Sequence, residues 1–288
     1  MIWLIYSQIS AISESFTNLL AKKRMKEFDS TVVIWGWVVS SLILLGGLVV
    51  ATGIPDLKPL FFTALFVRIL FDTFALLTYA KALQLGDISF IAPLFNFSAI
   101  ITLSISYVIN SELPSILGFI GILLVVFGAY VLNFESKKNG LLHPFKNMMR
   151  NKAAAYMLVS TVLYGIVFSV SKIGIQNSNL FFFTFASALG MSLTIFFIAY
   201  FKNRSDLFKI MKPRNFVKMI PIGFVDAIKI LALMATINTT FVSYADAANS
   251  TSTLYTVFFG AFFLKEKIKG RVIPAIIMFI GLILLAVS

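Results

Sequence analysis

Long apolar segments alternate with short polar connections along almost the whole chain of 288 residues. Each apolar segment has about 20 residues and ends at charged or turn-forming residues, the length that lets a helix cross a bilayer. The strict alternation of a membrane β-barrel is missing. The pattern predicts about ten transmembrane helices, at roughly 2–20, 30–52, 60–83, 88–109, 114–133, 153–174, 179–201, 215–237, 242–264 and 272–287.

Composition agrees with a membrane location. Hydrophobic residues make up 59% of the chain and charged residues 12%, with a mean hydropathy of +0.94. So much apolar surface cannot be buried inside one water-soluble globule. The chain has no cysteine and one histidine, which argues against disulfides and metal centres, and we expect no cofactor. The opening MIWLIY lacks a positive region and a cleavage site, so we interpret it as the first span.

Basic residues gather on one side of the predicted helices. The net charge is +12, and most of the 24 Lys and Arg lie in alternate connections, whereas the other side has only Lys58 and Lys172. The positive-inside rule places the basic connections in the cytoplasm and both termini outside. We therefore expect a multi-pass plasma-membrane protein. Aromatic residues are not interleaved with the basic ones as in RNA-binding surfaces, so no nucleic-acid partner is expected.

The second half of the chain repeats the first. Residues 72–112 and 226–266 align without a gap at a shift of 154, so that FDTFALLTYAKALQLGDIS corresponds to VDAIKILALMATINTTFVS. Each copy has five spans, an odd number, and the second copy must enter the membrane upside down. This indicates an all-α integral membrane protein of two inverted five-helix repeats around a central cavity, an architecture typical of transporters. We divide the chain into a first repeat (1–134), a basic connection (135–151) and a second repeat (152–288).

The duplicated pattern YAKALQLGDISFIAPL and SELPSILGFIGILLVVFGAYVL, with its partner FFLKEKIKGRVIPAIIMFIGLILLAV, resembles the EamA-type members of the drug/metabolite transporter superfamily. The resemblance covers nearly the whole chain and implies a secondary transporter, most commonly one that exports amino acids or related metabolites. The first span, with Glu14 eight residues before Lys22, also resembles the first helix of the small multidrug resistance proteins. In those proteins the equivalent glutamate exchanges protons for cationic drugs. Many EamA-type proteins have an aromatic residue at this position, as the second copy has in Tyr164.

The first span carries a polar stripe. Ser7, Ser10, Glu14 and Asn18 are three or four residues apart and share one face of a helix. An ionised carboxylate at the bilayer centre costs at least about 2.5 kcal/mol, so this face must contact protein or a wet cavity. Burial disfavours the charged form, and such a group can bind and release a proton near neutral pH. We predict Glu14 as the proton-coupling residue; the alternative is a glutamate that only holds helices together.

Two spans carry an acid and a base within one helical turn. Arg68 and Asp72 are four residues apart, Asp226 and Lys229 three, and the two acids are equivalent in the repeat. One interpretation is a pair of structural ion pairs buried between helices. The other is that the bases bind a substrate carboxylate or phosphate and the acids bind its amine, which would suit a zwitterion.

Polar side chains also mark the fourth and ninth spans. Asn96 lies close to one face of the fourth span with Pro93, which frees a backbone carbonyl. Asp246 and Asn249 lie on one face of the ninth. We predict Asn96, Asp246 and Asn249 as substrate contacts. The alternative is that these small and polar residues only allow close helix packing.

Tyr164 in the sixth span is a further predicted substrate contact, because an aromatic ring in a cavity can hold a cation. The first, third, fourth, sixth, eighth and ninth spans contain the ionisable and polar groups, and we expect them to surround the cavity. The second, fifth, seventh and tenth contain almost none, and we expect them to form a supporting shell. Glycines in the fifth span predict close helix contacts.

Enzymatic activity is not expected, since the chain has no Walker loop, GxGxxG fingerprint or nucleophile elbow. The sequence predicts proton-coupled efflux of small metabolites or cationic drugs by alternating access. Its partners are then a small-molecule substrate, protons and the lipid bilayer, and no oligomer is required. A uniporter or exchanger is the alternative mechanism. From other classes, a membrane scaffold or receptor and an intramembrane aspartyl enzyme built on Asp72 and Asp226 are the alternatives.

Overall fold

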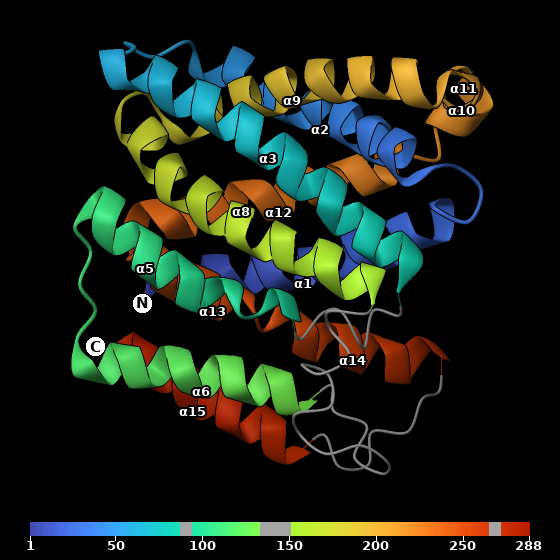
Figure 1. The fold of residues 1–288 in the computed structure, drawn as a ribbon. Helices are drawn as coiled ribbons and strands as arrows, with labels where there is room; N and C mark the ends of the chain where they lie inside the picture. Colours follow the sequence, from blue (N-terminus) through green and yellow to red (C-terminus); the bar gives the residue numbers. More distant parts are fainter. Residues whose placement is uncertain (87–93, 133–150, 265–271) are drawn as a thin grey trace.

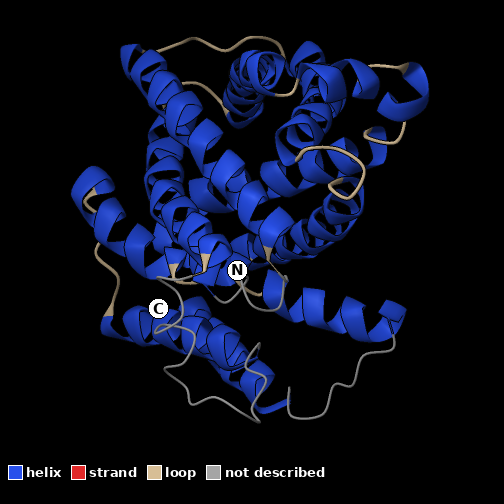
Figure 2. Ribbon diagram, turned by 45° about the vertical axis from the view of Figure 1, so that its right-hand side comes forward, coloured by secondary structure: helices blue, strands red, loops and turns tan. Residues whose placement is uncertain are grey.

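The computed structural model describes residues 1–86, 94–132, 151–264 and 272–288, and these ranges contain helices and no strand (Figures 1 and 2). The helices of the first half are α1 (Ile2–Arg24), α2 (Ser30–Thr52), α3 (Pro59–Leu85), α5 (Ser98–Asn110) and α6 (Ile116–Leu132). Those of the second half are α8 (Lys152–Gln176), α9 (Leu180–Lys202), α10 (Arg204–Ile210), α11 (Pro213–Phe216), α12 (Ile220–Thr239), α13 (Val242–Asn249), α14 (Ser252–Leu264) and α15 (Val272–Val287).

Several helices begin at a side chain that caps their free N–H groups. The Asp29 carboxylate accepts from the backbone of Thr31 at the start of α2. Asn151 caps α8 in the same way, and Asn179 caps α9. Each cap satisfies a donor that has no partner within the helix, which fixes where the helix starts.

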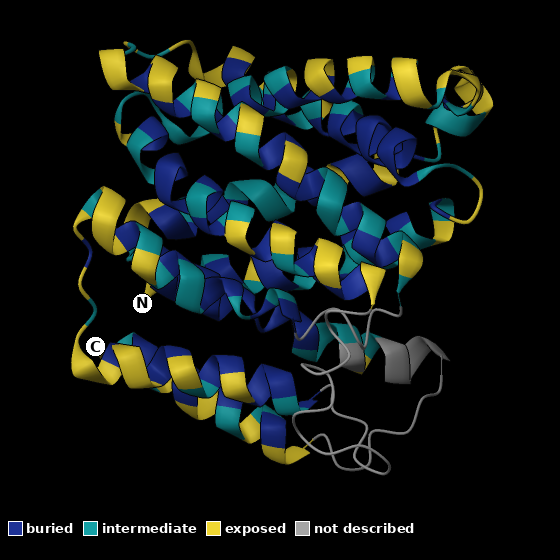
Figure 3. Cartoon of the chain, viewed as in Figure 1, coloured by how far each residue is buried: buried dark blue, intermediate teal, exposed yellow. Residues whose placement is uncertain are grey.

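The helices have the length and surface of membrane spans. Five of them, α2, α3, α8, α9 and α12, are long and apolar enough to cross a membrane. The apolar helices α5, α6 and α15 are shorter, and α1 is long but carries the buried polar face described above. Large apolar side chains are exposed on the outside of the bundle, as on α3 and α15, where lipid would cover them (Figure 3). The predicted all-α membrane fold is confirmed.

Helix pairing follows a two-fold relation between the halves. Helix α12 is the equivalent of α3, and α1 is the equivalent of α8. Helix α3 packs on α8, and α12 packs on α1. In the same way α5 packs on α8 and α14 packs on α1. In two further pairs a helix packs on its own equivalent in the other half: α2 on α9, and α6 on α15. This pattern of contacts is the one expected of two inverted repeats.

The pair α6 and α15 lies to one side of the bundle, apart from α2, α3 and α9 (Figures 1 and 2). Glycines bring the two backbones close together, as predicted for the fifth span. A Cβ atom at Gly121 would lie 3.0 Å from the carbonyl oxygen of Gly281, and one at Gly128 would lie 2.9 Å from that of Pro274. Side chains at these positions would force the helices apart.

The fourth and ninth spans are interrupted, which differs from the continuous helices expected at 88–109 and 242–264. A turn at Ser250 and Thr251 separates α13 from α14, and a turn at Asn96 and Phe97 precedes α5. The two interruptions are equivalent at the shift of 154. Serine, threonine and asparagine side chains compete for backbone hydrogen bonds, which favours a break at these positions. Pro93 lies outside the described residues.

Candidate functional site: a charged cavity between the repeats

A cavity of about 90 Å³ lies at the centre of the bundle, between the two halves. Both repeats contribute to it, through α1, α2, α3 and Phe95 from the first and through α8, α9, α12 and α13 from the second. One water molecule occupies about 30 Å³ in the liquid, so the cavity has room for about three. Of the residues predicted from the sequence, it is lined by Glu14, Arg68, Asp72, Tyr164, Asp226, Lys229 and Asn249.

The second and seventh spans also line the cavity, which corrects their expected place in a supporting shell. Helix α2 contributes Trp37 and Ser41, and α9 contributes Thr184 and Met191. These two helices pack on each other across the molecule and so both reach its centre. Sequence reasoning missed them because it followed ionisable groups, and neither helix has a charge at cavity level. Among the described residues, the fifth and tenth spans, α6 and α15, contribute none to this lining.

Glu14 is held by an amide from the other half of the molecule. Asn249 Nδ2 donates to Glu14 Oε2 at 2.6 Å, and both residues are buried. The other amide atom, Asn249 Oδ1, has no hydrogen-bond partner in the described part of the chain. Glu14 forms no ion pair with a described residue. Asn18, one turn further along α1, lines the same cavity, while Ser7 and Ser10 are buried.

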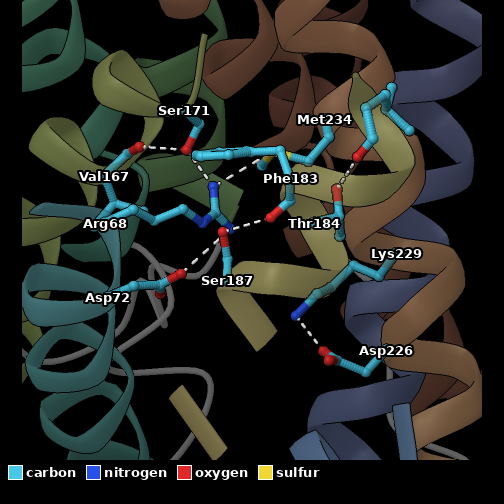
Figure 4. A network of polar contacts seen from close by, with 11 residues as sticks. Arg68, Asp72, Val167, Ser171, Phe183, Thr184, Ser187, Asp226, Lys229 and Met234 are labelled. Atoms are coloured by element: carbon cyan, nitrogen blue, oxygen red, sulfur yellow. Dashed lines mark hydrogen bonds and ion pairs between the residues drawn. The ribbon is translucent and has the colours of Figure 1, made fainter. Parts of the chain in front are cut away.

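Arg68 is surrounded on several sides (Figure 4). Its guanidinium forms an ion pair with Asp72 at 3.3 Å and donates to the hydroxyl of Ser171 and to the Met234 sulfur. The ring of Phe183 lies 5.5 Å from its central carbon, within the range of a cation–π contact. The side chains of Arg68 and Asp72 are only 2% and 8% exposed. Most of the guanidinium is therefore engaged by protein, although its buried Nε has no hydrogen-bond partner among the described residues.

The equivalent pair in α12 is more open. Lys229 Nζ lies 2.6 Å from Asp226 Oδ1, and the two side chains are 20% and 11% exposed (Figure 4). No other hydrogen-bond or ion-pair partner of Lys229 is found among the described residues. No hydrogen bond joins the Asp72 and Asp226 carboxylates; each contacts its own base, unlike the proton-sharing pair of an aspartyl enzyme.

Aromatic rings form one wall of the cavity. Tyr164 lies 5.4 Å from Phe95 and 5.3 Å from Phe168 between ring centroids. Tyr79 lies 5.2 Å from Phe95, so the four rings are continuous. All four line the cavity together with Glu14. Ring faces beside a carboxylate form an environment that attracts a cation.

Two predicted site residues lie outside this cavity. Asn96 donates to Thr253 Oγ1 at 2.9 Å and lines a smaller hollow of about 20 Å³ that also contains Glu14. Asp246 lines neither hollow. It is buried between α13 and α5, where it accepts hydrogen bonds from Ser98 and Thr102.

A salt bridge joins the two halves near one end of the helices. Glu112, which follows α5 in the first half, accepts from Lys172 Nζ of α8 at 2.5 Å. Its other oxygen accepts from the backbone N–H of Val242 at the start of α13, at 2.7 Å. Lys172 also donates to the carbonyl of Thr240. Sequence reasoning placed Lys172 on the side opposite to the basic connections but did not pair it with Glu112.

Comparisons with known proteins give a family and a fold. The family model described as the EamA-like transporter family matches residues 1–134 and again residues 151–287. A solved structure described only as the crystal structure of a protein superposes with a TM-score of 0.77 at 10% sequence identity, covering 99% of this chain and 96% of the other. At that identity it shows the fold alone. No curated protein matches the chain.

Proposed function

This chain belongs to the EamA-like transporter family and is a membrane transporter of small molecules, and from this we propose that it exports a small amine-bearing metabolite in exchange for protons. Export uses alternating access, with the two halves moving around the central cavity. We place it in the plasma membrane, with the basic connections in the cytoplasm and the termini outside, because the positive-inside rule favours that orientation.

The observation that carries the proposal is the set of ionisable groups around one cavity. Three acids (Glu14, Asp72 and Asp226) and two bases (Arg68 and Lys229) line it, which leaves one unit of negative charge when all five are ionised. A cationic group or a proton completes the balance. Because the other two acids are paired with their own bases, Glu14 is the group that can accept either one.

The substrate's ammonium group then binds where Glu14, the free oxygen of Asn249 and the aromatic wall meet. Protonation of Glu14 removes the charge that holds the ammonium and releases the substrate. A carboxylate on the same molecule would contact Lys229, whose single described partner leaves it donors to spare. A cavity of about 90 Å³ favours a molecule the size of a small amino acid over a bulky drug.

Alternating access requires a contact between the halves that can open on one side. Glu112 of the first half binds both Lys172 and the first N–H of α13 in the second. We propose that these bonds close the extracytoplasmic side, and that they break when the cavity opens there.

The test uses purified protein in sealed vesicles with a pH gradient. Wild-type protein should move amino-acid-like substrates uphill against their gradient when protons flow the other way. Glu14→Gln should lose this gradient-driven transport, because the amide cannot take up a proton.

Counterflow of labelled substrate separates the mechanisms. A uniporter or exchanger gives counterflow in the wild type with no proton movement, and Glu14→Gln then changes no pH dependence. That result would remove the coupling role of Glu14. Asp56→Asn, on an exposed connection, is the matched control.

A further inference from the structure

Asp246 is a buried carboxyl group that the transport mechanism above does not use. It lies on α13 of the second half, is 2% exposed, and contacts α5 of the first half. Ser98 Oγ donates to its Oδ1 at 2.9 Å, and Thr102 Oγ1 lies 2.6 Å from its Oδ2. The position equivalent to Asp246 in the first half is Ala92. The acid is therefore a feature of one half.

No basic side chain compensates a charge on Asp246 among the described residues. Helix α5 offers it only hydroxyl groups, and α1 brings a second acid, Glu14, to Asn249, one turn away on α13. On the other packed helices the ionisable groups are Tyr130 of α6, Lys152, Tyr156, Tyr164 and Lys172 of α8, and Asp226 and Lys229 of α12. Lys152 is the first residue of α8, and Lys172 and Lys229 are already paired, with Glu112 and Asp226. An ionised carboxylate buried without a counter-charge is strongly disfavoured.

The surroundings of Asp246 favour a proton as the cation that neutralises it. Both hydroxyl oxygens already lie at hydrogen-bond distance from the carboxyl oxygens, and no group of three or more His, Cys, Asp or Glu that could hold a metal ion is found among the described residues. A proton needs no additional space. When Asp246 is protonated, its Oδ2–H donates to Thr102 Oγ1, and the threonine hydroxyl turns to the carbonyl one turn earlier in α5, a bond that helical threonines commonly form.

We propose that Asp246 is a second proton-binding site, separate from the substrate cavity, that titrates when α5 and α13 move apart. The two helices belong to opposite halves, so a movement between the halves breaks the bonds to Ser98 and Thr102. Exposed to water, the acid loses its proton; when the contact re-forms, it takes one up. Asn249, which holds Glu14, lies one turn further along α13, so the same helix carries both sites.

Protonation of Asp246 is tested by infrared spectroscopy at neutral pH, which detects the carbonyl stretch of a protonated carboxylic acid. We expect this band in the wild type and in Glu14→Gln. Because a protonated Glu14 would absorb in the same region, Asp246→Asn is compared in the Glu14→Gln background, where it should remove the band. Asp56→Asn should leave it unchanged, since Asp56 is exposed. If Asp246→Asn does not fold, Asp246→Glu in a chain with isotope-labelled aspartate keeps the test: the band should lose its isotope shift, because the protonated group is then an unlabelled glutamate.

Absence of a protonated aspartate band, or its persistence when Asp246→Asn is added to Glu14→Gln, would overturn the proposal. The consequence for transport rests on the proposed function and has its own readout. Asp246→Asn should flatten the pH dependence of counterflow. Glu14→Gln should keep the part of this pH dependence that Asp246 causes. Failure of Glu14→Gln to lose proton-driven transport would instead count against the proposed function alone.

Discussion

The two ion pairs of the cavity occupy equivalent positions in the repeat and differ in nearly everything else. Asp72 and Asp226 correspond at the shift of 154, but the base precedes the acid in α3 and follows it in α12. Arg68 is enclosed by Asp72, Ser171, Met234 and Phe183. Lys229 has a single described partner and is partly exposed to the cavity.

An inverted duplication thus supplies two copies of one charged position, and the surroundings of the two copies differ. In the first half the pair braces helices α3 and α8, since Arg68 reaches across to Ser171. In the second half the pair borders the cavity with one base available to a ligand. We infer that the first pair mainly stabilises the fold and the second mainly contacts substrate.

The largest expected difference between the pairs is in stability. Asp72→Asn leaves Arg68 buried and unpaired, which typically costs about 3–5 kcal/mol. Asp226→Asn should cost only about 1 kcal/mol, because Lys229 is partly exposed and can be hydrated. Thermal unfolding in detergent measures both. Equal losses of stability in the two variants would contradict the inference that the first pair is the one that mainly stabilises the fold.

Substrate binding should respond in the opposite order. Lys229→Met removes a charge-assisted hydrogen bond worth about 1.5–3 kcal/mol, which corresponds to about 10- to 100-fold weaker binding of an amino acid. An amine of the same size without a carboxylate should bind both proteins alike. Binding is measured by ligand-induced thermal stabilisation. Equal weakening for the two ligands would show that Lys229 acts on the fold and not on the carboxylate.

Opening of the extracytoplasmic side should depend on Glu112. Glu112→Gln weakens the bond to Lys172 by about 1.5 kcal/mol, so the open state should become about tenfold more populated. The chain has no cysteine, and Ser41→Cys in the cavity gives a single labelling site. A membrane-impermeant thiol reagent added on the side of the termini should react about tenfold faster. An unchanged rate would place the closing contact elsewhere.

The smallest expected effect is at the aromatic wall. Tyr164→Leu removes one cation–π contact worth about 0.5–1 kcal/mol and should weaken ammonium binding about two- to fivefold. Tyr164→Phe keeps the ring and should bind like the wild type. A loss in Tyr164→Phe equal to that in Tyr164→Leu would assign the effect to the hydroxyl.

The spans were predictable because each is a continuous apolar segment. The duplication was predictable because equivalent residues recur at a constant shift along the chain. The interruptions at Asn96 and Ser250 were signalled by helix-weakening residues, yet the same residues fit a continuous polar face equally well. Spacing alone could not separate Asp246 from Asn249. They are three residues apart, but one contacts α5 and the other contacts Glu14 of α1.

Contacts between the two halves could not be predicted from the sequence. Glu14 with Asn249, and Glu112 with Lys172, join residues far apart in the chain whose proximity depends on how two five-helix units pack. The contribution of Trp37 and Thr184 to the cavity depends on the same packing. The pattern identified which residues were chemically unusual but not which of them meet.

The glycine contact between α6 and α15 limits how the halves can move. Backbone atoms of the two helices lie so close at Gly121 and Gly128 that an added side chain would collide with the partner helix. The last helix of each half therefore packs tightly on its counterpart. For the alternating access proposed above, we expect this pair of helices to act as the pivot, with the displacement growing toward α2, α3 and α9.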